Sequence, residues 1–276
     1  MEIIFQKYMY SGVYAAEKGC LLAESSLVST DYDAIGRMTA DYYSYRIKDA
    51  WWEICRSPAN EYLGSGQAPE LTGVEAYLGA GPSLRQAVGD IGGGIPLFLL
   101  SECVKAVLQA EQFMHTDRGY SSTASYELYW EEMYENSCRY YSNLDRVKRG
   151  WLEEEYVYKR AKGLFNRFLD CRVYRLDSGG MSVSGGFCDS AHELSAYLEM
   201  DSKGVITYSA GNYLRAPDAV CMENKAHIAG LRGRKPAELA KRKIGALLGG
   251  AQGCHHLLDL VNEMCETVTS ALNRSV

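Results

Sequence analysis

Two stretches decide the fold expected from this sequence: FQKYMYSGVY at 5–14 and FNRFLDCRVY at 165–174. They share Phe, Val and Tyr, exchange Lys/Arg, Tyr/Phe and Met/Leu, and lie 160 positions apart. The same offset aligns YDAIGRMTADYYS (32–44) with HELSAYLEMDSKG (192–204). A nearly constant offset over about ninety residues indicates an internal duplication. Offsets of 159 and 157 continue the match at Pro58 with Pro217, Gly92 with Gly249, and Gly93 with Gly250.

The second of these copies predicts strands followed by helices. From Leu194 to Met200, apolar residues alternate with more polar ones, which is the period of a strand with one buried face. A turn at 201–204 and a return strand at 205–214 complete a hairpin. Helices are expected at 221–231, from Lys235-Pro236 to Gly249-Gly250, and from about His255 onward. The last helix has an apolar stripe of Leu257, Leu258, Val261, Met264, Val268 and Leu272.

The pattern predicts an α+β fold of two modules, each with antiparallel strands followed by helices, joined by a helical linker. The first copy spans 1–114, the linker 115–164 and the second copy 165–276. Aromatic and apolar residues recur in the linker at three- and four-residue steps, so we expect an amphipathic helix or helical pair that packs the modules together. Its stripe consists of Tyr126, Tyr129, Trp130, Met133, Tyr134, Tyr141, Leu144, Val147 and Trp151.

Composition limits the classes of function. Hydrophobic residues make up 47% and charged residues 23%, so each half can bury a core. The net charge of -6 gives no whole-protein attraction for nucleic acid or anionic lipid. No apolar run approaches the roughly 18–20 residues that cross a bilayer, and MEIIFQKYMYSG lacks the features of a secretory signal. We therefore expect a cytoplasmic protein without a nucleic-acid or membrane partner, whose nine cysteines are reduced thiols.

Cysteine and histidine gather in the second copy. The candidate metal ligands are His192, Cys221, Cys254 and His256, because thiolate and imidazole together suit zinc, iron or an iron–sulfur cluster. Cys254 follows Gly253 at the expected start of the last helix, where unpaired backbone N–H groups favour a thiolate. Whether Cys188 and His255 are additional metal ligands is left open by the sequence.

The repeat distinguishes the two copies. In the first copy, the four candidate ligands fall in order on Tyr32, Tyr62, Leu97 and Leu99. Apolar or aromatic residues therefore replace all of them at once. The simplest interpretation is one module that keeps a metal site and a degenerate first module that has lost it.

The second copy resembles the U-type iron–sulfur cluster scaffold superfamily over about 165–272. The resemblance rests on Cys188 and His192, a hairpin, Cys221, the GRKPAEL stretch at 233–239, and CHHLL at 254–258. It is more similar still to an uncharacterised bacterial family with a C-terminal Gly-Cys-Thr-His-Leu signature, whose Cys and His would correspond to Cys254 and His256. The scaffold family implies a cluster-binding α+β fold, whereas the uncharacterised family implies no activity.

This sequence departs from the scaffold pattern at its ligands. His192 stands where the family has Asp, Cys254 where it has His, and His255 where it has the last Cys, while the first Cys is displaced to Cys188. These residues favour a static zinc or iron site, or a retained [2Fe-2S] cluster with mixed ligands, over cluster assembly.

Three hypotheses of function follow. The leading one is a metal-binding protein with zinc, iron or an iron–sulfur cluster in the second copy. The second is an enzyme that acts on a small molecule held between the copies, through the Cys254 thiolate or a metal-activated water. The third is an interaction module in which the Tyr/Trp-rich first copy and linker bind a protein partner and any metal is structural. No P-loop, GxSxG, HExxH, EF-hand or paired CxxC motif appears.

Overall fold

The computed structural model describes residues 1–148, 150 and 159–274, which form two compact units. The first unit holds residues 8–123 and 159–168, and the second unit holds 1–7, 124–148 with 150, and 169–274. Strands β1 (Glu2–Ala16) and β6 (Gly163–Arg175) contribute residues to both. The described residues contain nine strands and six α-helices, which confirms the predicted mixture of strand and helix.

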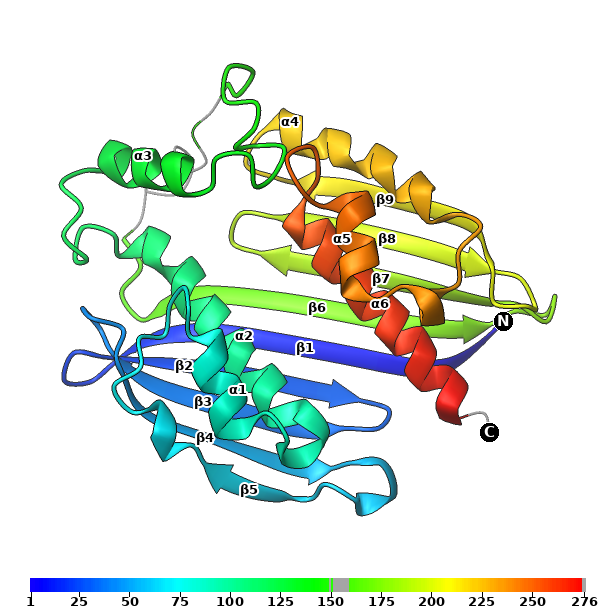
Figure 1. Cartoon of the computed structure of the whole chain (residues 1–276), viewed down its shortest axis with the longest axis horizontal. Helices are drawn as coiled ribbons and strands as arrows, with labels where there is room; N and C mark the ends of the chain where they lie inside the picture. Colours follow the sequence, from blue (N-terminus) through cyan, green and yellow to red (C-terminus); the bar gives the residue numbers. More distant parts are fainter. Residues whose placement is uncertain (149, 151–158, 275–276) are drawn as a thin grey trace. The chain divides into compact units, whose positions relative to one another are not determined.

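In the first unit, strands follow one another in the order β5-β4-β3-β2-β1 and carry helices on one face (Figure 1). The register of β2, β3, β4 and β5 is antiparallel throughout. Helix α2 (Ile95–Ala110) packs on β2, β3 and β4. Close packing depends on Gly36 in β3, because a Cβ atom there would lie 2.8 Å from Cβ of Leu99. The other elements are β2 (Cys20–Ser29), β3 (Asp33–Asp41), β4 (Ile47–Arg56), η1 (Pro58–Asn60), β5 (Gly64–Gln67), η2 (Pro69–Leu71), α1 (Gly81–Val88), η3 (Ile91–Gly94) and η4 (Glu111–Phe113).

In the second unit, the strand order is β6-β7-β8-β9, with β7 (Met181–Asp189), β8 (Glu193–Met200) and β9 (Ile206–Arg215) antiparallel. The predicted hairpin is confirmed: alternate residues of β8 from Leu194 to Met200 are buried. Asp201 accepts hydrogen bonds from the backbone N–H groups of Lys203 and Val205 and so closes the turn. The helices that follow pack on this sheet, with α6 (His255–Arg274) against β7 and β8 (Figure 1).

The helical predictions for this unit are confirmed in part. Residues 221–231 are helical, as the end of α4 (Ala219–Met222) and the 3-10 helix η5 (Glu223–Leu231). The single helix expected from Lys235 was wrong: the chain makes η6 (Pro236–Glu238), leaves helical geometry at Leu239, and starts again as α5 (Lys241–Leu248). In α6, Leu257, Val261, Met264 and Val268 are buried as predicted, but Leu272 is 39% exposed and Ala271 is buried instead.

Among its described residues, the expected linker is helical only at α3 (Thr123–Met133), after which 134–147 forms turns. Trp130 is buried and packs on Tyr134 with ring centroids 4.9 Å apart, whereas Met133 is exposed and Trp151 lies outside the described residues. One helical stretch in the described residues, Ile91–Phe113, is long and apolar enough to cross a membrane, contrary to the expectation that none is. Its α2 portion packs on the sheet of the first unit, as a core helix does.

Candidate metal centre

The turn between β7 and β8 is organised by one carboxylate. Oδ1 of Asp189 accepts hydrogen bonds from the backbone N–H groups of Ala191 at 2.8 Å and His192 at 2.7 Å. The guanidinium of Arg215, at the end of β9, donates to the backbone carbonyls of Asp189 and Ser190. The turn is therefore stabilised by its own Asp189 carboxylate and by Arg215 of the neighbouring strand β9. Both sets of contacts fix the backbone that carries His192.

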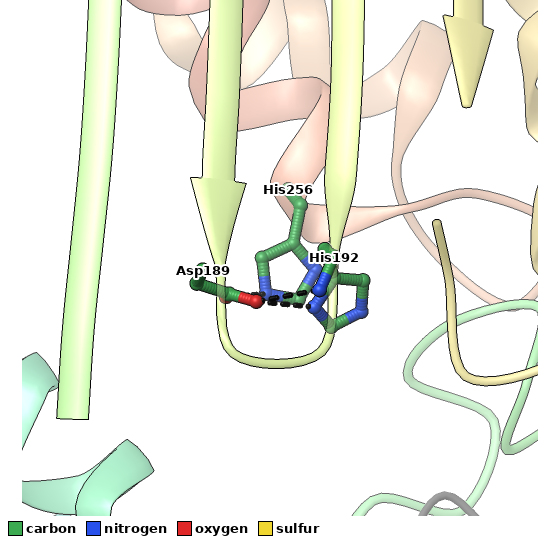
Figure 2. Close-up of side chains that lie close together, drawn as sticks. All are labelled: Asp189, His192 and His256. Carbon is green, nitrogen blue, oxygen red and sulfur yellow. Dashed lines mark hydrogen bonds and ion pairs between the residues drawn. The ribbon is translucent and has the colours of Figure 1, made fainter. Parts of the chain in front are cut away.

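Two imidazole rings meet beside this carboxylate, as Figure 2 shows. Nδ1 of His192 lies 3.1 Å from Oδ1 of Asp189, and Nε2 of His256, from the first turn of α6, lies 3.8 Å from Oδ2. The ring centroids of the two histidines are 3.8 Å apart at an interplanar angle of 30°. Ligand atoms of Asp189, His192 and His256 all lie within 4.8 Å of one another, the only such trio in the described part of the chain.

The carboxylate at the centre is charged although it is buried. The Asp189 side chain is 2% exposed, and burial alone would favour its neutral form. The charge and hydrogen bond of His192, with the charge of His256, outweigh burial and hold the pKa of Asp189 well below its usual range. A buried anion beside two nitrogen ligands is the electrostatic environment that a divalent cation neutralises.

Cys254 lies next to this trio. It directly precedes α6, and its backbone N–H donates to the Leu248 carbonyl at 2.7 Å. Burial opposes ionisation of the Cys254 thiol, but the hydrogen bond and charge of His256, helped by Tyr213 and the Leu257 N–H, lower its pKa. The lowered pKa agrees in direction with the predicted thiolate, but its main cause is His256 rather than the start of the helix.

The other predicted ligands are placed differently. Cys221 is buried in α4 against Val220 and Tyr140 and is not part of the trio. Cys188 is followed in β7 by Asp189, so the two side chains point to opposite faces of the sheet, and the Arg215 guanidinium lies 3.6 Å from its sulfur. His255 is exposed. His227 contacts Arg139 and is not part of the trio.

The residue that sequence reasoning missed is Asp189. Its place at the end of β7, three residues before His192, was the available signal, since an Asp at a turn often caps the backbone N–H groups two and three residues later. Nothing in the sequence showed that its second oxygen would meet a histidine 67 positions away in another element.

The donor set fits a mononuclear metal ion. Zn–N and Zn–O bonds of about 2.0–2.2 Å place two ligand atoms of one tetrahedral ion roughly 3.3–3.6 Å apart, close to the 3.8 Å between His256 Nε2 and Asp189 Oδ2. Two histidines and one carboxylate also form the usual ligand set of non-haem ferrous iron. Asp189, His192 and His256 would hold the ion.

The second unit is thus an α+β domain with a candidate Asp/His centre at the turn between two inner strands of its sheet. Residues 157–270 match the model of a family described as a protein of unknown function (DUF2889). The matched stretch contains Asp189, His192, Cys254 and His256. No curated protein and no solved structure gives a significant match. The resemblance to iron–sulfur scaffolds therefore stays a prediction.

Proposed function

We propose that this chain is a metal-binding protein with a mononuclear zinc or iron site at Asp189, His192 and His256. The observation that carries the proposal is the trio of ligand atoms within 4.8 Å of one another around a buried, ionised carboxylate. The two carboxylate oxygens of Asp189 make different contacts. Oδ1 accepts the backbone hydrogen bonds of the turn, while Oδ2 faces Nε2 of His256 at 3.8 Å, where an ion would bind.

An iron–sulfur cluster and an enzyme are the weaker proposals. Cys221 lies apart from the trio, so a cluster with mixed ligands would require it to move. A catalytic site keeps an open coordination position, and three protein ligands would leave one. The lowered pKa of Cys254 also suits a nucleophile, but no substrate is indicated.

The first unit offers a matched control for the site. There, Ser29 Oγ accepts from the backbone N–H groups of Asp31 and Tyr32, as Asp189 does from Ala191 and His192. An Asp189→Ser variant should therefore keep the turn but lose the anionic ligand. We expect zinc and ferrous affinity to fall at least 10- to 100-fold, measured by anaerobic calorimetric titration, with little change in melting temperature.

Metal analysis of anaerobically purified protein decides the metal. One zinc or iron per chain without acid-labile sulfide supports a mononuclear site, and iron with sulfide supports a cluster instead. Folded protein that holds no metal and takes up none would overturn the proposal. So would an Asp189→Ser variant that binds as tightly as the wild type.

We also propose that the two units derive from one duplicated module, of which only the second keeps the site. Three equivalences support this proposal. In each unit the strands precede the long helix, and the turn-capping residues Ser29 and Asp189 lie 160 positions apart. Arg56 donates to carbonyls of the β2–β3 turn, and Arg215, 159 positions later, donates to carbonyls of the β7–β8 turn. Tyr32 occupies the position of His192. The first unit thus has the same turn without the imidazole or the carboxylate.

A further inference from the structure

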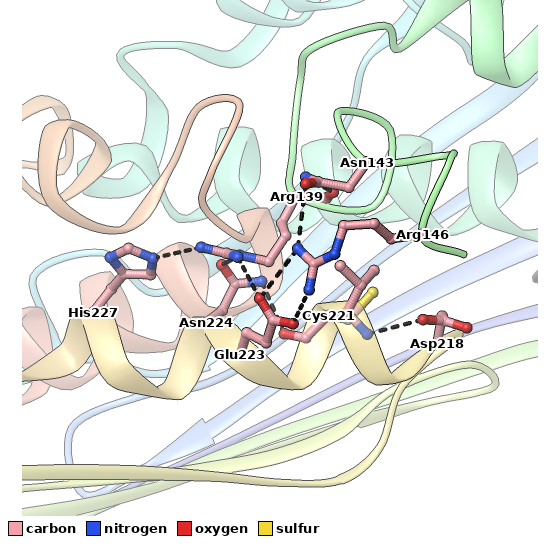
Figure 3. A network of polar contacts seen from close by, with 9 residues as sticks. Arg139, Asn143, Arg146, Asp218, Cys221, Glu223, Asn224 and His227 are labelled. Atoms are coloured by element: carbon pink, nitrogen blue, oxygen red, sulfur yellow. Dashed lines mark hydrogen bonds and ion pairs between the residues drawn. The ribbon is translucent and has the colours of Figure 1, made fainter. Parts of the chain in front are cut away.

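A segment that precedes the second copy lies close to Cys254. Residues 134–148, here called the cap segment, are hydrogen-bonded to η5 through two arginines (Figure 3) and to the N-cap of α4 through a backbone N–H. Arg139 donates to Glu223 at 2.6 Å and to Asn224 Oδ1 at 3.3 Å, and Arg146 donates to the other Glu223 oxygen. At the end of the segment, the Lys148 N–H donates to Asp218, the N-cap of α4.

This attachment brings three cysteines together. The backbone N–H of Arg139 donates to the Gly253 carbonyl at 2.9 Å. This hydrogen bond brings Cys138, which precedes Arg139, near Cys254, which follows Gly253. Cys138 also packs on the buried pair Val220 and Cys221. Three thiols from the cap segment, α4 and the start of α6 therefore lie in one region of the second unit.

Two buried hydroxyls face the same thiols. The Tyr213 and Ser137 hydroxyls are buried and make no hydrogen bond of standard geometry in the described structure. The Tyr213 hydroxyl lies close to the Cys254 thiol, and that of Ser137 lies close to the Cys138 thiol. A buried polar group without a partner costs about 1–3 kcal/mol, and an ion or water bound nearby is a common reason for it.

The thiols also affect one another. Burial is the main reason that the pKa of Cys138 is raised and that the pKa of Cys221 is raised to about 12, and the neighbouring thiols contribute to both shifts. Neighbouring thiols in an apolar environment are a combination that a thiophilic divalent cation stabilises, because metal binding replaces their protons.

We propose that Cys138, Cys221 and Cys254 form a second metal site, a three-thiolate site for a thiophilic divalent cation of the zinc and cadmium class. None of the three belongs to the Asp189 trio, so this site stands or falls separately from the proposed function. In the described structure their sulfur atoms do not form a trio within 4.8 Å of one another, so the site requires them to move closer together when the ion binds. Each thiol loses its proton to solvent as its sulfur binds the ion, and no redox change occurs.

Cadmium titration of the reduced full-length chain tests the site, because each sulfur-to-cadmium bond contributes to an ultraviolet charge-transfer band. We expect Cys138→Ser to reduce the band by about one third and to weaken cadmium binding at least tenfold. The exposed Cys55 gives a matched control, and Cys55→Ser should change neither. Asp189→Ser should leave the band in place, which separates the two sites.

A measurement on the wild-type chain does not depend on how the variants fold. Cys138 is half-buried and open to alkylation, as Cys20 is, whereas Cys221 and Cys254 are buried. Mass spectrometry should show that cadmium slows alkylation of Cys138 and leaves that of Cys20 and Cys55 unchanged. Equal alkylation of Cys138 with and without cadmium, or a band that Cys138→Ser leaves intact, would overturn the proposal.

Discussion

His256 contacts both groups of candidate ligands. One side of its ring approaches Asp189 and His192, while it also hydrogen-bonds to Cys254 two residues earlier in the chain. An imidazole that favours ionisation of a thiol and a carboxylate at once is well placed for metal chemistry. The same ring packs on Phe187 of β7 with centroids 5.2 Å apart, so its orientation is set by the sheet as well as by polar contacts.

Cys265 shows how a thiol behaves where no such neighbour exists. It is 2% exposed in α6, and burial, with a smaller effect of Glu266, raises its pKa from 9.0 to about 12. The raised pKa favours the neutral thiol in the folded state, so this contribution is present below about pH 9 and is lost as the pH rises towards 12.

We therefore expect Cys265→Ala to weaken the alkaline loss of stability. At pH 10 the unfolded thiol is mostly ionised and the folded one is not, which costs the wild type roughly 1 kcal/mol relative to pH 7. Urea unfolding at the two pH values measures the difference. The variant should lose about that much less between them, whatever its stability at pH 7, and equal losses would contradict the assignment.

At the scale of elements, the β7–β8 turn and the β2–β3 turn form a natural comparison. Arg215 binds the carbonyls of the first and Arg56 those of the second. Removing either guanidinium should cost about 1–3 kcal/mol, because the carbonyls lose a charged hydrogen-bond donor. Only Arg215→Ala should also weaken zinc binding, since only that turn carries His192.

Thermal unfolding and calorimetric zinc titration of the two variants distinguish positioning from general stability. Arg215→Lys keeps a cation but not the paired donors, so we expect it to recover part of the affinity. If Arg56→Ala weakened zinc binding as much as Arg215→Ala, the turn would have no specific role at the site.

Helix packing gives a second paired prediction. In β3, a methyl group at Gly36 would lie 2.8 Å from Leu99 Cβ, an atom attached directly to the α2 backbone. In β7, a methyl group at Gly185 would meet Cγ of Met264 at 2.8 Å and Cδ1 of Leu260 at 2.9 Å, which are parts of flexible side chains. We expect Gly36→Ala to reduce the free energy of unfolding by about 1–3 kcal/mol and Gly185→Ala by less. Denaturant unfolding of both variants measures the order, and a larger loss for Gly185→Ala would contradict it.

Elements with a local signal were the predictable ones. The alternation from Leu194 to Met200 and the turn at Asp201 predicted the β8–β9 hairpin, and the capping position of Cys254 predicted the start of α6. The break at Leu239 was missed because no Gly or Pro marks it. Of the predicted ligands, His192 and His256 lie together, Cys254 contacts His256, and Cys221 lies apart. Asp189 and the neighbouring Cys138 could not be found, since their roles arise from contacts between distant parts of the chain.

At the scale of the whole molecule, each unit contains a largely buried ion pair between a strand and its long helix. Lys7 pairs with Glu263 at 2.6 Å in the second unit, and Arg167 pairs with Glu102 in the first. The cations lie 160 positions apart and the carboxylates 161. In both cases a residue from one sequence copy is needed to neutralise a carboxylate of the other, so neither copy alone is a complete unit.

An isolated fragment of residues 159–276 should consequently be unstable. Without Lys7, Glu263 is left as an uncompensated buried charge, at a cost of about 3–5 kcal/mol. Circular dichroism and urea unfolding of the fragment should show a weakened fold. The Glu263→Gln fragment, which lacks the charge, should recover part of the loss, and no difference between the two fragments would contradict the prediction.

Gly253 has a consequence for the history of such chains. A Cβ atom at this position would lie 2.2 Å from the Leu248 carbonyl oxygen and 2.3 Å from that of Gly249, so only glycine allows the loop to close before Cys254. The clash involves backbone atoms alone, so the glycine is needed whether or not residue 254 is a cysteine. A descendant that abandons the thiol is therefore expected to keep the glycine.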